Sequence, residues 1–254
     1  MDPRELFTDR ATDYAKFRPG YPDELIEHLC AQCGLCATST VADIGSGTGI
    51  FANQLTGTEA TVYAVEPNDG MRAESERSFG TNSQFRSVPG SAEQVPLDDG
   101  SVDLVTAAQS FHWFDAARAR REFERVLKPP GWVALVWNVR MVKTTAFQKG
   151  YEELLRLWAP TYTGAQHHED EAERIRLFFA PATFEKTSFP NPQFLFWEEL
   201  RGRAMSASYF PLPGDSAHEP AVDALRELFE DNKQGGRVDF DYSTELFLGK
   251  LKPG

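Results

Sequence analysis

Short apolar runs alternate with amphipathic stretches along the first half of the chain. Helices are expected at residues 22–30, 50–55, 69–78 and 116–127. Apolar residues recur at helical spacing in the first of them, whereas residues 69–78 form a polar helix. Strands are expected at residues 40–44, 61–65, 84–88, 102–108 and 132–137, of which residues 40–44 and 102–108 are mostly apolar. Strands that alternate with helices in this way predict an α/β fold with a parallel, doubly wound sheet. Such a sheet binds its ligand at the carboxyl ends of the strands.

The alternation changes after Asn138. We expect helices at residues 144–158, 171–179, 198–207 and 221–229, and a polar loop at 160–170. Strands are expected at residues 183–189, 194–197, 237–240 and 245–248. Internal repeats and low-complexity segments are absent from the sequence, so the late segment is expected as an insertion carried by one α/β domain.

The composition is that of an ordinary globular protein. Of 254 residues, 41% are hydrophobic and 25% are charged, which indicates neither disorder nor a fibrous repeat. No apolar run approaches the roughly 20 residues that a membrane span needs. The N-terminal residues are charged rather than signal-like. We therefore expect a cytoplasmic protein with no membrane partner.

The charge of the chain disfavours a nucleic-acid partner. Its 26 basic and 38 acidic residues give a formal charge of −12, which repels a phosphate backbone. The densest basic stretch contains Arg118, Arg120, Arg121, Arg125 and Lys128. Glu122 and Glu124 interrupt it, as is typical of a solvated helix face. We expect no nucleic acid to bind there.

The cysteines have a spacing that iron–sulfur proteins also use. Cys30, Cys33 and Cys36 follow the pattern C-x2-C-x2-C, but Thr40 stands where a ferredoxin-type run needs its fourth cysteine. The chain has no other cysteine to complete a four-thiolate site. The stretch is better interpreted as the end of a helix that stops near Gly34.

Two histidine arrangements offer weaker metal candidates. His28 is available to join the three thiolates on zinc. His167 and His168 stand beside Glu169 and Asp170, but adjacent side chains diverge on any regular backbone. We interpret that stretch as a solvated loop and expect no metal site.

The most informative stretch is residues 41–49, Val-Ala-Asp-Ile-Gly-Ser-Gly-Thr-Gly, at the end of the first expected strand. Glycines at alternate positions let the backbone approach a ligand closely. The helix that follows offers free N–H groups at its N-terminus. By itself this pattern is also compatible with a simple tight turn.

Two acidic residues refine the interpretation. Glu66 ends the second expected strand, where a carboxylate can accept hydrogen bonds from the hydroxyls of an adenine-linked ribose. NAD also has such a ribose, but Ile50 stands where its G-x-G-x-x-G fingerprint needs the third glycine. Asp43 would repel a diphosphate and attract an ammonium group. Together these residues favour a cationic nucleoside without phosphate.

With these motifs the chain resembles the class I S-adenosylmethionine-dependent methyltransferases from about Tyr14 to Asn138. The matching motifs are residues 43–49, 65–68, 90–97, 101–105 and 127–132. Residues 14–22 and 109–115 are similar to the small-molecule branch that includes trans-aconitate-type methyltransferases. The resemblance implies a Rossmann-like, seven-stranded, mostly parallel sheet with its last strand antiparallel, helices on both faces and a C-terminal cap insertion.

The resemblance also divides the chain. Residues 1–36 are expected as an N-terminal lid and helix, and residues 37–140 as the S-adenosylmethionine-binding core. Residues 141–236 are expected to form an acceptor-binding cap together with late core elements. Residues 237–254 are expected to contain the final strand.

The resemblance implies that S-adenosylmethionine lies along the carboxyl edge of the sheet. Glu66 would hold the ribose hydroxyls, Asp43 would lie near the ammonium group, and Gln109 would face the methionine. Tyr14 and Arg18 lie on a segment that resembles a lid. Arg18 would bind the methionine carboxylate, with a surface ion pair as the alternative. The glycine turn would contribute Gly45, Ser46, Gly47 and Gly49.

A second group of contacts is implied around the adenine ring. Met71 would supply a soft apolar surface to it. The residues implied are Pro67, Asn68, Met71, Ser91, Ala92 and Glu93.

His112 follows the fourth expected strand and has two interpretations. It can act as a general base on the acceptor. It can equally be a packing residue, because Phe111, Trp113 and Phe114 surround it in sequence.

The cap is rich in aromatic residues, some of which should line an acceptor pocket. They include Phe178, Phe179, Phe194, Phe196, Trp197 and Tyr209. Arg201 and Arg203 are candidates to bind an anionic acceptor.

The expected function is methyl transfer from S-adenosylmethionine to a small molecule, such as a carboxylate or another oxygen nucleophile. One alternative is an NAD-dependent oxidoreductase, which Ile50 and a missing Tyr-x-x-x-Lys pair disfavour. The other is a methyltransferase-like protein that binds the nucleoside without turnover.

Overall fold

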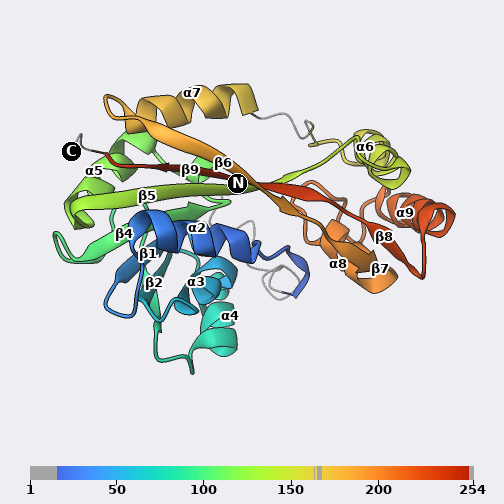
Figure 1. Ribbon diagram of the computed structural model, residues 1–254. Coiled ribbons are helices and arrows are strands. Elements are labelled where there is room, and N and C mark those ends of the chain that lie inside the picture. Colours follow the sequence, from blue (N-terminus) through green and yellow to red (C-terminus); the bar gives the residue numbers. More distant parts are fainter. Residues whose placement is uncertain (1–15, 163, 165–167, 252–254) are drawn as a thin grey trace.

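The computed structural model describes residues 16–162, 164 and 168–251. A seven-stranded sheet in the order β3-β2-β1-β4-β5-β9-β6 crosses it (Figure 1). The strands are β1 (Thr40–Ile44), β2 (Thr61–Glu66), β3 (Phe85–Pro89), β4 (Val102–Ala108), β5 (Leu127–Arg140), β6 (Phe184–Asn191) and β9 (Tyr242–Gly249). Strands β1 to β5 pair in parallel, whereas β9 runs antiparallel to both β5 and β6. The predicted mostly parallel sheet with an antiparallel last strand is confirmed.

Helices cover both faces of this sheet. They are α2 (Asp23–Cys33), α3 (Ile50–Thr56), α4 (Asp69–Phe79), α5 (Ala116–Val126) and α7 (His168–Phe179). Leu25 and Phe51 pack on one face together with Val41, while Phe123 packs on the other face together with Ala42. Neighbouring strand residues therefore enter opposite core clusters, which explains why the strands are almost continuously apolar. Among the described residues, no helix is both long and apolar enough to cross a membrane.

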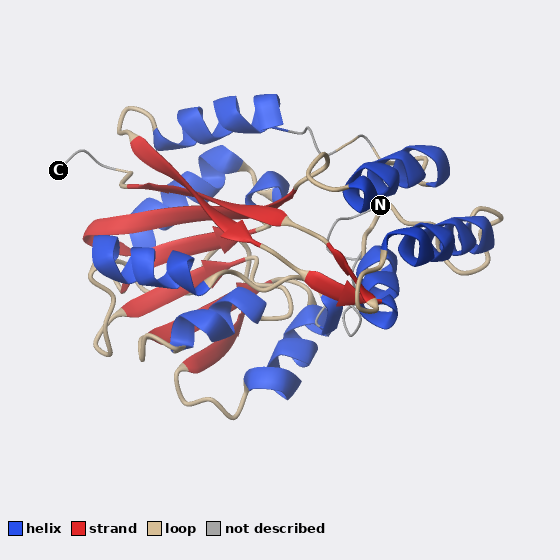
Figure 2. Cartoon of the chain, turned by 45° about the vertical axis from the view of Figure 1, so that its right-hand side comes forward, coloured by secondary structure: helices blue, strands red, loops and turns tan. Residues whose placement is uncertain are grey.

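Further elements form a separate unit, which we call the cap. They are α6 (Ala146–Trp158), α8 (Trp197–Met205), α9 (His218–Asn232), β7 (Phe194–Phe196) and β8 (Arg237–Asp239). Strands β7 and β8 form a separate antiparallel pair. Figures 1 and 2 show these elements gathered beyond one end of the main sheet, whereas α7 and β6 lie with the sheet. The cap has its own hydrophobic cluster, which includes Phe147, Leu200 and Phe229.

Strand β5 begins earlier than we expected. The run Lys128-Pro129-Pro130-Gly131 ends helix α5 as expected, but it lies inside a strand that begins at Leu127 rather than Trp132. Leu127 pairs with Val102, and the register then shifts so that Trp132 pairs with Leu104. Prolines are tolerated in sheets at such irregularities. The sequence pattern indicated where helix α5 ends, but it did not indicate that Leu127, just before this run, pairs with Val102.

The cysteine-containing segment is a helix end, as expected. Helix α2 finishes at Cys33, and Gly34 follows at a φ of 70° with its N–H donated to the carbonyl of Cys30. Among the residues that the structure describes, no group of three His, Cys, Asp or Glu side chains is arranged to hold a metal ion.

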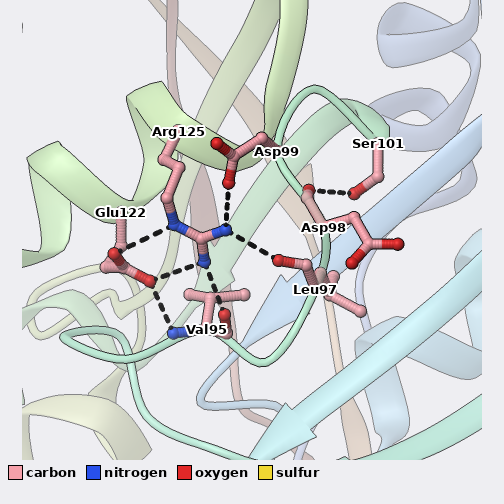
Figure 3. A network of polar contacts seen from close by, with 7 residues as sticks. All are labelled: Val95, Leu97, Asp98, Asp99, Ser101, Glu122 and Arg125. Carbon is pink, nitrogen blue, oxygen red and sulfur yellow. Dashed lines mark hydrogen bonds and ion pairs between the residues drawn. The ribbon is translucent and has the colours of Figure 1, made fainter.

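The basic stretch on α5 is less solvated than we expected. Arg125 donates to the carbonyls of Val95 (2.7 Å) and Leu97 (2.8 Å) and pairs with Asp99 and Glu122 (Figure 3). The N–H of Val95 donates to the Glu122 carboxylate (2.9 Å). These contacts anchor the loop that follows the turn at residues 91–93. Part of the basic stretch therefore supports the site from within the chain.

Candidate functional site

Two adjoining cavities lie at the carboxyl edge of the sheet. Their volumes are about 460 and about 100 Å³, and both are bordered by Arg18, Gly45, Gly47 and Gln109. The larger one is also bordered by the predicted residues Glu66, Pro67, Met71, Ser91, Ala92, Glu93 and His112. The smaller one is also bordered by the predicted residues Asp43 and Ser46. Tyr14 lies outside the described residues.

Gly49 differs from the other two glycines of the motif, because it borders neither cavity. It caps the N-terminus of α3 at a φ of 81°, and a Cβ atom there would lie 3.1 Å from the side chains of Phe79, Phe85 and Ser75. Its role in this structure is to make the turn and to allow close helix packing.

Glu66 ends β2 with its carboxylate held in a fixed orientation. Its side chain is buried, with 8% of the residue exposed. One carboxylate oxygen accepts from the N–H of Gly47 and the other from the N–H of Asn68, each at 2.9 Å. Burial raises the pKa of this carboxyl group. Each oxygen keeps a lone pair, so the group can accept from two further hydroxyls.

Asp43 lies beneath the smaller cavity, on β1. Only 1% of it is exposed, and the hydroxyl of Thr106 on β4 donates to its Oδ1 atom (2.6 Å). Burial outweighs this hydrogen bond and raises the pKa of Asp43 to about 7. A cationic ligand group in the cavity would favour the ionised form.

We expect the ligand-free protein to lose stability as the pH rises from about 4 to about 7. In that range the folded Asp43 keeps a proton that the unfolded side chain has already released, because burial raises its pKa to about 7. Asp43→Asn should make the dependence on pH shallower. Urea unfolding of both proteins at several pH values measures this. Equal slopes would contradict the prediction.

Gln109 follows β4 in an unusual backbone conformation. Its φ is 56°, in a left-handed region that residues other than glycine rarely adopt. Its backbone N–H donates to the carbonyl of Val136 (2.9 Å), and its side-chain amide donates to the carbonyl of Asn138 (3.1 Å). Such strain concentrates at functional sites. The hydrogen bonds keep Gln109 between the two cavities.

His112 lies on a short turn of 3₁₀ helix, Phe111–Trp113, after β4. Phe111 is fully buried, whereas His112 and Trp113 border the larger cavity. Arg174 on α7 donates to the backbone carbonyls of His112 (3.1 Å) and Phe114 and so holds the turn. His112 is thus at the cavity, and its role as a general base stays a prediction.

The cap residues that we singled out have different fates. Of the six aromatic residues, Tyr209 borders the larger cavity. Phe178 and Phe179 are buried in the main core, and Phe194 and Phe196 are exposed on β7. Trp197 packs against the hydrophobic cluster of the cap, so five of the six residues border neither cavity.

The two candidate arginines also differ. Arg201 is exposed. Arg203 is buried, donates to the carbonyl of Phe17, and lies 3.4 Å from the hydroxyl of Tyr242. Arg203 is therefore close to a residue that borders the smaller cavity, and Arg201 is a useful control for it.

Several residues that border the cavities were not expected from the sequence, among them Asn138, Ser208 and Tyr242. Asn138 lies near the end of β5, at the edge where ligands of parallel sheets bind. Tyr242 begins β9, and its cross-strand partner is Arg140. The expected antiparallel direction of the last strand could have identified Tyr242. An antiparallel β9 begins at the edge where the parallel strands end, which is where the cavities lie.

Comparison with known proteins supports the family. Residues 42–135 match the methyltransferase domain family. An uncharacterised methyltransferase-like protein of Schizosaccharomyces pombe is 38% identical over 262 aligned positions, which cover 100% of this chain and 98% of the relative. An uncharacterised methyltransferase of Mycobacterium tuberculosis is 41% identical over 127 residues, covering 50% of this chain and 49% of the relative. That match spans about half the length of each protein.

Solved structures support the fold. A candidate type II methyltransferase from Anaeromyxobacter dehalogenans superposes with a TM-score of 0.67 at 20% identity, covering 94% of this chain and 100% of that structure. This likeness shows the fold, and the full-length fission-yeast match shows the family. The chain belongs to the class I methyltransferases.

Proposed function

We propose that the protein transfers a methyl group from S-adenosylmethionine to a small-molecule acceptor. The observation that carries this proposal is the buried Glu66 carboxylate, which Gly47 and Asn68 orient beside the larger cavity. Its remaining lone pairs suit the two hydroxyls of a ribose. The residues present therefore fit a nucleoside.

The charges around the cavities favour S-adenosylmethionine over NAD. Asp43 and Glu66 are both buried carboxyl groups, and Arg18 is the basic residue at both cavities. A diphosphate would lie close to these acidic groups without a matching set of cations. An amino acid offers one ammonium group for Asp43 and one carboxylate for Arg18.

When bound, S-adenosylmethionine would supply a methyl group activated by its sulfonium, and S-adenosylhomocysteine would be the leaving product. The chain contributes positioning and exclusion of water. Gln109 and Arg18 would orient the methionine end, and Glu66 the ribose. His112 and Trp113 border the larger cavity, and the acceptor would lie beside them. A carboxylate acceptor needs no proton removed, whereas a hydroxyl would require His112 as a base.

Basic residues beside the smaller cavity favour an anionic acceptor. Arg140 and Arg203 lie beside the smaller cavity without bordering it: Arg140 is the cross-strand partner of Tyr242, and Arg203 lies 3.4 Å from the Tyr242 hydroxyl. Arg140 pairs with Glu152 (2.6 Å). Only 8% of the Arg140 side chain is exposed, and its buried Nη1 atom makes no hydrogen bond to the described residues. A buried guanidinium with an unused donor is suited to a ligand carboxylate.

The acceptor is tested by incubating the protein with methyl-labelled S-adenosylmethionine and pairs of small carboxylic acids and their neutral amides. We expect label on acids only. We expect Arg140→Gln to raise the KM of the acid about tenfold, because a charged hydrogen bond is lost. Arg201→Gln, at an exposed position, should change nothing.

The double variant Arg140→Gln/Glu152→Gln keeps the test usable if the unpaired Glu152 destabilises the single variant. Label on the amides, or an acid KM unchanged by Arg140→Gln, would contradict an anionic acceptor. Cofactor binding without transfer to any compound would favour a non-catalytic nucleoside-binding protein.

A further inference from the structure

Residues 17–21, which we call the strap, cover the smaller cavity. Arg18, Pro19 and Tyr21 border it directly. The strap is held from the cap side, because Arg203 donates to the carbonyl of Phe17 and Arg18 donates to the carbonyl of Ser206 (3.0 Å). It therefore joins the cap to the part of the site where we expect the amino-acid end of the cofactor.

The strap is held equally firmly from the sheet side. The side chain of Gln54 accepts from the N–H of Tyr21 (3.0 Å) and donates to its carbonyl (2.8 Å). The carbonyl of Gly20 accepts from the side-chain amides of Asn191 (3.0 Å) and Asn138 (3.2 Å). These four hydrogen bonds determine where the strap lies above the cavity.

Asn191 is the most remote of these anchors. It ends β6, outside residues 42–135 that match the domain family, and borders neither cavity. It is 5% exposed, and its amide also donates to Asn138 Oδ1 (3.1 Å) and Thr244 Oγ1 (3.2 Å). The side-chain amide of Gln193 donates to the side-chain oxygen Oδ1 of Asn191 (2.8 Å). The amide is thus fixed on both sides and aimed at Gly20.

We propose that Asn191 is a positioning residue for the cofactor, acting through the strap. The inference rests on the proposed function, because it needs S-adenosylmethionine in the cavity. By fixing the carbonyl of Gly20, Asn191 sets the position of Arg18 two residues earlier. Arg18 then meets the carboxylate of the cofactor without a further ordering cost. Asn191 acts on the amino-acid end of the ligand and not on its adenosine.

The difference between the two ends provides the test. S-adenosylhomocysteine carries the amino-acid end, whereas 5′-methylthioadenosine lacks it. We expect Asn191→Leu to weaken binding of S-adenosylhomocysteine about tenfold, the effect of losing one buried hydrogen bond and the order that it maintains. Binding of 5′-methylthioadenosine should stay within about twofold of wild type, as measured by calorimetric titration of both ligands.

Two further variants guard the interpretation. Asn191→Asp keeps the size of the side chain but cannot donate to Gly20 when ionised, so it should repeat the effect if Asn191→Leu fails to fold. Asn232→Leu makes the same substitution at the end of α9, where the side-chain amide donates to the carbonyl of Leu228 in the same helix (2.9 Å), and should bind both ligands normally.

Each outcome has a distinct meaning. Equal weakening of both ligands would reveal only general loss of structure and overturn the inference, as would no weakening of either. Wild-type protein that binds neither nucleoside would contradict the proposed function itself.

Discussion

Glu66→Ala is expected to weaken binding of S-adenosylmethionine at least about a hundredfold. The buried carboxylate is oriented by Gly47 and Asn68 and has lone pairs for two ribose hydroxyls. Two hydrogen bonds to a charged group contribute together about 3 kcal/mol or more, which corresponds to this loss of affinity. Glu66→Gln should lie between, because an amide offers one acceptor oxygen. Calorimetric titration measures all three proteins.

Glu74 provides a matched control for Glu66. It is exposed to the same 8%, lies on the neighbouring helix α4 and pairs with Arg77, but borders neither cavity. Glu74→Ala should leave cofactor affinity unchanged, whatever its effect on stability. Similar affinities for the Glu66 and Glu74 variants would show that Glu66 has no specific role in binding.

Gly47→Ala is expected to weaken cofactor binding roughly 30-fold while the fold is retained. Among the described residues, a Cβ atom at Gly47 would have only Met71 Sδ within 4 Å, at 3.9 Å, so it would project into the space that both cavities share. A methyl group in a closely packed site costs about 2 kcal/mol, which corresponds to this factor. The φ of 57° adds about 1 kcal/mol of strain to the folded protein.

Gly100→Ala separates strain from obstruction. Gly100 has a φ of 59°, no atom of the part of the chain that the structure describes lies within 4 Å of its Cβ position, and it borders neither cavity. Both alanine variants should therefore lose similar stability in urea unfolding, and only Gly47→Ala should lose affinity. If the cofactor bound Gly47→Ala as tightly as wild type, the backbone of this turn would not contact it.

The first half of the chain was predictable because its signals are local. An apolar run, a glycine turn and a helix start are each contained within about ten residues, and repeating them requires a parallel sheet. Glu66 could be identified for the same reason, since it ends a strand at the expected edge. The packing role of Gly49 was not predictable, because its neighbours Phe79 and Phe85 come from later elements.

The contacts that the sequence did not reveal join distant segments. Arg125 looked like part of a solvated face, but its partners Val95 and Leu97 are brought to it by tertiary packing. Asn191 and Gly20 are 171 positions apart, and no pattern along the chain relates them. Aromatic residues of the cap were equally ambiguous, because the same side chains suit a core and a pocket.

We propose that the cavity binds a sulfur nucleoside. Calorimetric titration of the protein with S-adenosylmethionine, S-adenosylhomocysteine and NAD tests this directly. We predict that both sulfur nucleosides bind and that NAD gives no binding heat. Binding of NAD alone would contradict this prediction and would indicate that the glycine turn binds a dinucleotide.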